Sequence, residues 1–436
     1  MKISIMGLGY VGAVSAGCLA RQGHEVIGVD PQQAKVDLIN AGRTPIIEKD
    51  IGEIIASAVA EGRLRATADV LEAVRHTDLS LICVGTPSLG NGHIDLKYVR
   101  RVCEQIGEGL RDHPGHIVVV RSTMLPGTLR NVVIPALEGA SGLKAGEDFG
   151  VCLNPEFLRE GTAVHDYFHP PKTVIGELDR ASGDALVKLY EGLPGPVIRT
   201  DYETAEMVKY ADNTWHALKV AFANEIGNVC KALGLDSHKL MDIFCQDTKL
   251  NLSPYYLKPG FAFGGSCLPK DVRALSYKAR LLDVKVPIID AILPSNDEQI
   301  ERGIQAVIDK GEKKVGVLGF SFKAGTDDLR ESPMVELVER LLGKGYDLRI
   351  YDSSVRMAAI HGANREYILN HIPHISRLMV PSLDEVIAHA RTLVIGNAAP
   401  EFRDVPRRLD EGQQVVDLVR IADTRSVEGV YDGICW

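Results

Sequence analysis

The stretch KISIMGLGYVG, from Lys2 to Gly12, joins a strand-like segment to a glycine-rich turn. A helical segment follows to about Gln22, and residues 23–30 form a second strand-like segment that ends in Asp30. A GxGxxG motif alone is weak evidence. A strand before it, a helix after it and an acid about 20 residues further on together mark a dinucleotide-binding unit. Because this stretch has all three features, it predicts an α/β, doubly wound, Rossmann-like domain.

The glycines and the acid indicate which dinucleotide is expected. Gly7 permits the tight turn, Gly9 lets the backbone approach a pyrophosphate, and Gly12 lets the helix pack on the strand. Asp30 suits a ribose 2′-hydroxyl, whereas a 2′-phosphate would meet like charge, so NAD is expected rather than NADP. The alternative is a glycine-rich turn in an α/β fold that binds nothing.

Two later strand-like segments also end in polar turns. Residues 79–84 precede Thr86, and residues 117–120 precede Thr123. Ligands of a doubly wound sheet lie beyond the carboxyl ends of its strands, so both threonines are placed to touch the cofactor or the reacting carbon. Each is also a candidate helix N-cap, and the two roles can coexist.

The bulk composition narrows the class of protein. With 436 residues, the chain is expected to form two or three domains. A formal net charge of -9 argues against nucleic acid as a partner. The eight cysteines show no CxxC spacing, which favours reduced thiols in a cytoplasmic protein and no metal centre. No apolar run approaches the roughly 20 residues of a membrane span, so no membrane partner is expected.

The middle of the chain combines a short loop with a long helical pattern. Residues 154–160 (NPEFLRE) carry two carboxylates after a strand, and residues 202–233 keep helical periodicity. Two opposite stripes run along this helix. The polar stripe consists of Lys209, Asn213, His216, Val220 and Asn224, and the apolar stripe of Met207, Ala211, Trp215, Leu218 and Phe222. The polar stripe is either a solvated outer face or, because it is poor in charge, a surface that binds a polar ligand.

The last third of the chain repeats the pattern of the first. Residues 314–319 and 345–352 again run strand, glycine turn, helix, glycine, strand and Asp, but without GxGxxG. The longer loop brings Lys323 and Arg330 toward a sheet edge, where two cations suggest a phosphate-bearing ligand. The expected domains are an NAD-binding domain, a central helical domain and a nucleotide-type domain, over residues 1–200, 201–300 and 301–436.

The motif FGGSCLPKD, from Phe263 to Asp271, places Cys267 after two glycines, and this sulfur is either one more buried thiol or a nucleophile. Together with GLGYVG, NPEFL, the helix of Lys209 and Asn213, and the sequence RESP at 330–333, the motif resembles the nucleotide-sugar 6-dehydrogenase family of UDP-glucose and GDP-mannose dehydrogenases. The motifs occur in order over essentially the whole chain. The segment ending in GFAF and the terminal GICW resemble the GDP-mannose branch.

The resemblance implies a fold and a reaction. Two Rossmann-like domains are joined by a long central helix and a helical dimerisation region that carries the catalytic cysteine. A primary alcohol at C6 becomes a carboxylate with two NAD, here GDP-mannose to GDP-mannuronate, which feeds uronic-acid polysaccharides such as alginate. Cys267 adds to the aldehyde, and the thiohemiacetal is oxidised to a thioester that water cleaves.

The resemblance also assigns roles to residues of this chain. The catalytic set is Cys267, Lys209, Asn213, Asp271 and Glu160. The cofactor set is Gly7, Gly9, Tyr10, Val11, Gly12, Asp30, Lys35, Thr86, Thr123, Lys270 and Arg330. The substrate set is Glu160, Lys209, Asn213, His216, Asn224, Tyr255, Tyr256, Lys258, Phe261, Gly264 and Lys323.

Within these sets, Lys209 and Asn213 hold the developing oxyanion. Asp271 orients the thiol or water, and Glu160 is a candidate base for thioester hydrolysis, while the assignment of individual protons stays open. In the family a partner subunit contributes the loop around residues 255–261, which implies a homodimer or larger oligomer. The family's usual residue at Lys258 is arginine, so this chain keeps the charge there but loses the bidentate fork.

Three alternatives remain at this point. UDP-glucose 6-dehydrogenase has the same chemistry with another base and another hexose. A β-hydroxyacid dehydrogenase of related fold uses a lysine and needs no cysteine, so the GGSC sequence argues against it. A non-catalytic sensor of NAD or a nucleotide sugar is disfavoured by the joint presence of Cys267, Lys209, Asn213 and Asp271.

Overall fold

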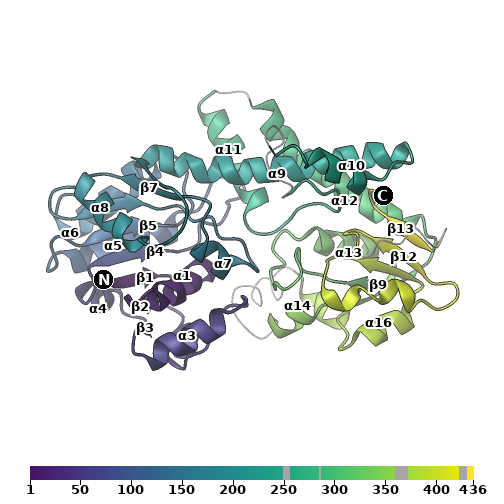
Figure 1. Cartoon of the computed structure of the whole chain (residues 1–436), viewed down its shortest axis with the longest axis horizontal. Coiled ribbons are helices and arrows are strands. Elements are labelled where there is room, and N and C mark those ends of the chain that lie inside the picture. Colours follow the sequence, from purple (N-terminus) through teal and green to yellow (C-terminus); the bar gives the residue numbers. More distant parts are fainter. Residues whose placement is uncertain (249–255, 284–285, 359–371, 422–429) are drawn as a thin grey trace. The chain divides into compact units, whose positions relative to one another are not determined.

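The computed structural model describes residues 1–248, 256–283, 286–358, 372–421 and 430–436. These residues form two compact units, Met1–Asp212 and Asn213–Trp436, and each is described by itself (Figure 1). Tyr255, one of the predicted substrate residues, lies outside the described residues.

The N-terminal unit is built on one eight-stranded sheet in the order β3-β2-β1-β4-β5-β6-β7-β8. The strands are parallel except for β6 and β7, which pair antiparallel. Their bounds are β1 (Lys2–Met6), β2 (Glu25–Val29), β3 (Leu64–Thr67), β4 (Leu79–Ile82), β5 (Ile117–Val120), β6 (Gly150–Leu153), β7 (Thr173–Glu177) and β8 (Val197–Asp201).

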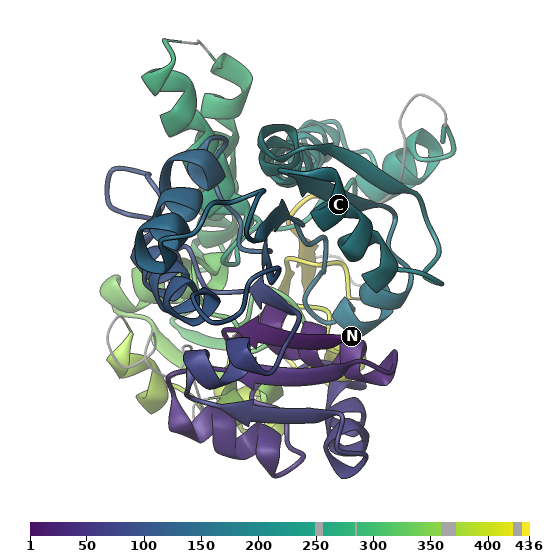
Figure 2. The ribbon, with the colours of Figure 1, turned by 90° about the vertical axis from the view of Figure 1, so that its left-hand side faces the viewer.

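Helices cover both faces of this sheet (Figure 2). Ile3, Ser4 and Ile5 are all buried, as expected for a central parallel strand that is covered on both sides. The helices are α1 (Tyr10–Arg21), α2 (Gln33–Asn40), α3 (Ile51–Ala60), α4 (Val70–Arg75), α5 (Lys97–Leu110), η1 (Leu129–Val133), α6 (Ile134–Ser141), α7 (Ala163–Phe168) and α8 (Arg180–Leu189).

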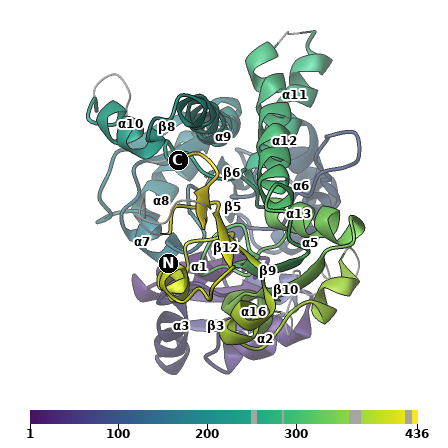
Figure 3. The same cartoon turned by 90° about the vertical axis from the view of Figure 1, so that its right-hand side faces the viewer.

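The C-terminal unit contains a second, all-parallel sheet in the order β10-β9-β11-β12-β13 (Figure 3). Val317 and Val394 belong to the core cluster that includes residues of α13, whereas Leu318 and Leu393 belong to the cluster that includes residues of α16. Both faces of the sheet are therefore covered. The bounds are β9 (Lys314–Leu318), α13 (Pro333–Gly343), β10 (Asp347–Tyr351), α14 (Ser353–Ala358), η2 (Pro373–Arg377), α16 (Leu383–His389), β11 (Thr392–Ile395), η3 (Pro400–Phe402), η4 (Val405–Arg407), β12 (Gln414–Asp417) and β13 (Tyr431–Gly433).

The two sheets share one local hydrogen-bonding arrangement. After β2, the Asp30 carboxylate accepts the backbone N–H of Leu8, at 2.9 Å, from the turn that follows β1. After β10, the Asp352 carboxylate accepts the backbone N–H of Phe320, at 2.8 Å, from the turn that follows β9. In both cases an acid at the end of the second strand fixes the first strand-to-helix turn. This recurrence confirms the predicted second α/β unit.

The long helix predicted over residues 202–233 is confirmed as α9 (Tyr202–Ala232), which begins in the first unit and continues into the second. Three side chains of its polar stripe are buried, because Lys209, Asn213 and Asn224 are 6%, 7% and 3% exposed, and the other two are half-buried. Its apolar stripe includes exposed side chains, because Trp215 and Phe222 are 45% and 41% exposed. The polar stripe is therefore not a solvated outer face.

Three further helices complete the second unit: α10 (Ser237–Phe244), α11 (Leu268–Leu281) and α12 (Pro287–Ile308). Over the part of the chain that the structure describes, no helix combines the length and the apolar character that crossing a bilayer requires.

Candidate active site

The glycine-rich turn after β1 has the shape of a pyrophosphate cradle. Gly7 has a φ of +99°, and its N–H donates to the carbonyl of Val29 at 2.7 Å. A Cβ on Gly12 would collide with the carbonyl oxygen of Gly7, so only glycine lets α1 approach the turn this closely. A Cβ on Gly9 would meet nothing within 4 Å. The turn is open at Gly9, where the N-terminus of α1 can receive an anionic group.

The other predicted cofactor residues of this unit lie at the same edge of the sheet. Asp30 is buried and also accepts the ammonium of Lys35 at 3.1 Å, so its carboxylate is held in place. The hydroxyl of Thr86, after β4, donates to the carbonyl oxygen of Thr123, after β5, at 2.9 Å. Val11 lies in the first turn of α1. These groups fit a dinucleotide laid across the carboxyl ends of the strands.

Lys209 has an acidic partner that sequence reasoning did not select. Its ammonium lies 2.9 Å from Glu156, and both side chains are buried. Burial by itself raises the pKa of Glu156, but the charge and hydrogen bond of Lys209 outweigh it, together with the backbone N–H of Leu158, so the pKa is lowered. The predicted base Glu160 is half-buried on the same loop. The only sequence signal for Glu156 was that the NPEFLRE stretch carries two carboxylates rather than one.

Cys267 lies at the N-cap of α11 and is exposed. All eight cysteines fall within described residues, and of the other seven, Cys245 is intermediate and the rest are buried. A helix N-terminus favours a negative charge at this position, which suits a thiolate. The exposure of Cys267 therefore argues against the alternative of a buried structural thiol.

The predicted catalytic groups of the second unit come together around this cap. Asn213 donates its side-chain amide to Asp271, which is buried in the first turn of α11. The N–H of Asp271 donates to the carbonyl of Cys267 at 2.9 Å. The ammonium of Lys270 lies 3.3 Å from Asp271 Oδ1, an oxygen that accepts no hydrogen bond from the described residues.

The FGGSC and RESP motifs pack against each other. A Cβ on Gly264 would collide with the carbonyl oxygen of Glu331 and with the ring of Pro333, so glycine is required there. The carboxylate of Glu331 also accepts from the guanidinium of Arg273, at 2.7 Å for one of the two contacts. The motif that contains Cys267 is thus packed against a motif that lies far from it in the sequence.

The predicted substrate residues on α9 contact the loop that follows the undescribed residues 249–255. The rings of His216 and Tyr256 stack with centroids 4.9 Å apart. Asn224 donates to the carbonyl of Phe261 at 3.1 Å and accepts the N–H of Gly260 at 2.9 Å, so its amide holds this loop in place.

Four further cations of this unit differ in exposure. Lys258 and Lys323 are exposed, whereas the guanidinium of Arg330 pairs with Asp328 at 2.7 Å. Lys219, which was not predicted, is buried with its ammonium 5.5 Å from the centroid of the Tyr256 ring. Its sequence signal was its position three residues after His216 on the same helix.

Comparison with known proteins agrees over the whole chain. Residues 1–194, 203–298 and 316–428 match the NAD binding, central and UDP binding domains of the UDP-glucose/GDP-mannose dehydrogenase family. The GDP-mannose 6-dehydrogenase of Pseudomonas syringae pv. syringae is 56% identical over 438 residues, covering 100% of both chains.

Solved structures point the same way. A ternary complex of GDP-mannose dehydrogenase from Pseudomonas aeruginosa is 55% identical, with 100% of both chains covered and a TM-score of 0.58. A UDP-glucose dehydrogenase from Pyrobaculum islandicum is 34% identical, covering 100% of this chain and 98% of that one, with a TM-score of 0.90. With its glycine-rich cofactor turn, its exposed cysteine and these matches, the chain belongs to the UDP-glucose/GDP-mannose dehydrogenase family.

Proposed function

We propose that this protein is an NAD-dependent GDP-mannose 6-dehydrogenase, which converts GDP-mannose, two NAD⁺ and water to GDP-mannuronate, two NADH and protons. The observation that carries the choice of sugar nucleotide is the 56% identity over the full chain to a GDP-mannose 6-dehydrogenase. The UDP-glucose dehydrogenase above is 34% identical, so UDP-glucose is the second candidate substrate.

The cysteine accounts for the second oxidation. The glycine-rich turn from Gly7 to Gly12 would hold NAD, which would supply the hydride acceptor for each oxidation. The thiolate of Cys267 adds to the C6 aldehyde and retains it as a thiohemiacetal, which loses a hydride to become a thioester. Water then cleaves the thioester, releasing the carboxylate and regenerating the thiolate. The exposure of Cys267 at the N-cap of α11 supports this role.

Each remaining group has a proposed part in these steps. Lys209 and Asn213 lie one helical turn apart on α9 and donate to the oxygen at C6 as it gains negative charge. Glu156 holds the first donor and Asp271 holds the second. The other oxygen of Asp271 is suited to accept a hydrogen bond from the thiol or from water. Glu160 serves as the base for thioester hydrolysis.

A homodimer is part of the proposal. The exposed side chains of Trp215 and Phe222 lie on one side of α9, and Phe222 also packs near Phe244 with ring centroids 6.1 Å apart. Large apolar side chains gathered on an exposed helix face are typical of a protein interface. A second copy of this chain is the proposed occupant, and its loop 256–261 would complete the substrate site.

An end-point assay tests the proposal. The purified protein is incubated with excess NAD⁺ and a limiting amount of GDP-mannose, of UDP-glucose or of neither, and NADH is measured by absorbance. Two NADH per GDP-mannose are expected. If UDP-glucose gives this yield and GDP-mannose does not, UDP-glucose is the substrate. If neither sugar nucleotide gives NADH, a sensor is favoured.

The variant Cys267→Ser tests the covalent route. Because only the aldehyde trap requires sulfur, net formation of the acid is expected to collapse while NADH still binds with wild-type affinity. NADH binding is followed by fluorescence titration and acid formation by mass spectrometry of the product. Full turnover by this variant would exclude the thioester mechanism.

A further inference from the structure

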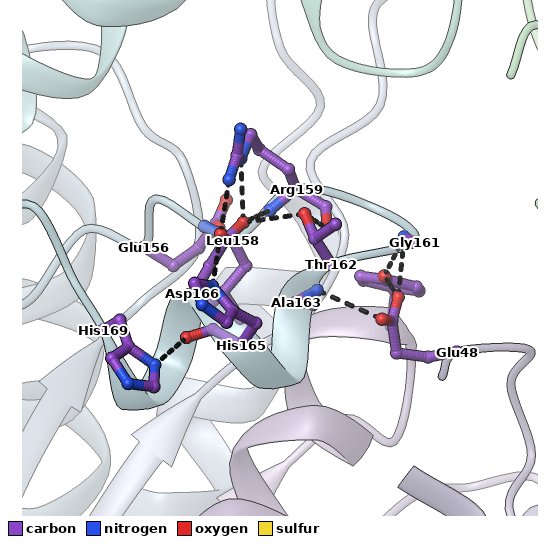
Figure 4. Close-up of polar contacts among 11 residues, drawn as sticks. Glu48, Glu156, Leu158, Arg159, Gly161, Thr162, Ala163, His165, Asp166 and His169 are labelled. Carbon is purple, nitrogen blue, oxygen red and sulfur yellow. Dashed lines mark hydrogen bonds and ion pairs between the residues drawn. The ribbon is translucent and has the colours of Figure 1, made fainter. Parts of the chain in front are cut away.

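The loop that carries Glu160 is fixed immediately before this residue. Asp166 of α7 receives three hydrogen bonds from Arg159: from its backbone N–H at 3.0 Å, from Nε at 2.9 Å and from Nη2 at 2.6 Å (Figure 4). Burial raises the pKa of Asp166, but the bonds to Arg159 outweigh it and the pKa is lowered, so the carboxylate stays charged. The backbone on the N-terminal side of Glu160 is thus tied to α7.

A second carboxylate fixes the loop immediately after Glu160. Glu48, from the segment between α2 and α3, accepts the N–H of Gly161 at 2.7 Å and the N–H of Ala163 at 3.1 Å (Figure 4). Ala163 is the first residue of α7, so this carboxylate satisfies a helix N-terminal donor that the helix itself leaves unpaired. Gly161 has a φ of +83°, which favours glycine at this bend.

Glu48 also reaches the cofactor turn. The hydroxyl of Tyr10 donates to the same carboxylate, and it accepts the N–H of Gly161 at 3.1 Å. Tyr10 is the first residue of α1 and directly follows Gly9, the open position of the glycine-rich turn. Burial, followed by the hydrogen bond and the charge of Glu48, raises the pKa of Tyr10, so the phenol remains a donor at every physiological pH.

We propose that Glu48 is a positioning residue that ties the glycine-rich cofactor turn to the loop carrying Glu160. Three donors from two chain segments converge on its carboxylate, and two of them belong to the residues that flank Gly9 and Glu160. A dinucleotide that orders the N-terminus of α1 therefore also orders the backbone beside Glu160. The role of Glu160 as a base rests on the proposed function, whereas the tie itself does not.

The test uses Glu48→Gln, Tyr10→Phe and the double variant in the full chain. Glutamine keeps the size of glutamate but replaces one acceptor oxygen with an NH₂ group that faces N–H donors, so part of the tie is lost. Phenylalanine keeps the ring and removes only the hydroxyl. Glu53→Gln is the matched control, because Glu53 is exposed in the first turn of the adjacent helix α3.

The first measurement is NADH affinity by fluorescence titration. Because hydrogen bonds to charged groups are among the stronger ones, Glu48→Gln and Tyr10→Phe are each expected to weaken NADH binding about five- to tenfold. The double variant is expected to be no weaker than Glu48→Gln alone, since both changes break one connection. The proposal would be wrong if Glu48→Gln bound NADH with wild-type affinity. It would also be wrong if the fold-loss of affinity in the double variant equalled the product of the two single fold-losses.

The second measurement is hydrogen–deuterium exchange of the peptide that contains Gly161 and Ala163, with and without NADH. In the wild-type protein and in Glu53→Gln, NADH is expected to slow exchange at these amides. In Glu48→Gln their exchange is expected to be faster and insensitive to NADH. Protection by NADH that persists in Glu48→Gln would show that Glu48 only caps α7 and would end the proposal.

The catalytic consequence has its own readout. When NAD⁺ and GDP-mannose are supplied, Glu48→Gln is expected to accumulate the thioester on Cys267, seen as an added sugar-nucleotide mass on the intact protein. If the wild-type protein makes no NADH from any sugar nucleotide, the proposed function fails, but NADH affinity and amide exchange still decide the role of Glu48. If the wild type turns over and Glu48→Gln shows no thioester at reduced kcat, the link to hydrolysis fails.

Discussion

At the scale of single residues, polar side chains of the candidate site are held by carboxylates that are distant in sequence. Asn213 donates to Asp271, 58 residues away, and Tyr10 donates to Glu48, 38 residues away. The motif around Cys267 left both a buried thiol and a nucleophile open, and the resemblance of the whole set of motifs to a known family selected the nucleophile. The partners Glu156 and Glu48 could not be selected, because only the fold brings an isolated acid to its donors.

The exposure of Cys267 leads to a labelling prediction. Iodoacetamide at neutral pH is expected to modify Cys267 first, because it is exposed at a helix N-terminus whereas Cys245 is only partly accessible. Peptide mapping after a short reaction identifies the labelled residue. A mixture of NADH and GDP-mannose is expected to slow the labelling. Faster modification of Cys245 would contradict the assignment of Cys267 as the reactive thiol.

The pair of Lys209 and Glu156 leads to a stability prediction. Lys209→Met leaves a buried carboxylate without its cation, which is expected to lower the free energy of unfolding by about 3 kcal/mol at pH 7. The matched control is Lys172→Met, because the ion pair of Lys172 with Asp212 is partly exposed and should contribute about 1 kcal/mol or less. Urea unfolding of both variants measures the difference.

The pH dependence of that loss has a definite sign. In the wild-type protein the pKa of Glu156 lies below that of an unperturbed glutamate, so its stabilisation is fully present above about pH 4.5 and is lost as the pH falls through the folded-state pKa. In Lys209→Met, burial instead raises this pKa, and protonation relieves the buried charge. The difference in the free energy of unfolding between the wild-type protein and Lys209→Met is therefore expected to become smaller between pH 7 and pH 4. A difference that stays constant over this pH range would show that Lys209→Met loses stability through packing alone.

At the scale of elements, periodicity predicted α9 to within a residue at each end, because its 31 residues keep the helical pattern and contain no proline. Periodicity could not decide which stripe is buried. In α9 polar side chains are buried and a tryptophan is exposed, which is the reverse of the usual amphipathic arrangement. Which side of the helix is buried depends on the tertiary structure. The antiparallel pairing of β6 with β7 was also beyond prediction, since strand direction depends on the path of the chain through the loop and α7 between them.

The glycine-rich turn leads to a prediction that separates packing from binding. Gly12→Ala is expected to destabilise the N-terminal unit by several kcal/mol, because the added methyl group meets the carbonyl oxygen of Gly7. Gly9→Ala is expected to change stability by no more than about 0.5 kcal/mol, since its Cβ would meet no protein atom. It should still abolish tight NADH binding by occupying the approach to the turn. Thermal unfolding and NADH titration distinguish the two, and a destabilised Gly9→Ala would show that this position is packed.

At the scale of the whole molecule, one chain contains two α/β units. In each unit an aspartate after the second strand accepts a backbone N–H from the turn that follows the first strand. The sequence predicted both units because strand, glycine, helix and acid recur in the same order. It could not show whether one chain holds a complete substrate site. Tyr256 and Phe261 are held by His216 and Asn224 of their own chain, and the exposed apolar side of α9 offers a surface for a second copy.

Subunit complementation tests whether the substrate site is shared between two copies. Cys267→Ser and Lys258→Ala are each expected to be inactive, the first without the proposed nucleophile and the second without an exposed cation of the loop 256–261. If a partner supplies that loop, a mixed dimer has one site with neither change. Random pairing of the two variants during co-expression should then restore about a quarter of wild-type activity. The double variant Cys267→Ser with Lys258→Ala, co-expressed with wild type, provides the matched control for mixing. No recovered activity in mixed dimers, confirmed by mass spectrometry of the assembly, would place the loop and the cysteine of one site on the same chain.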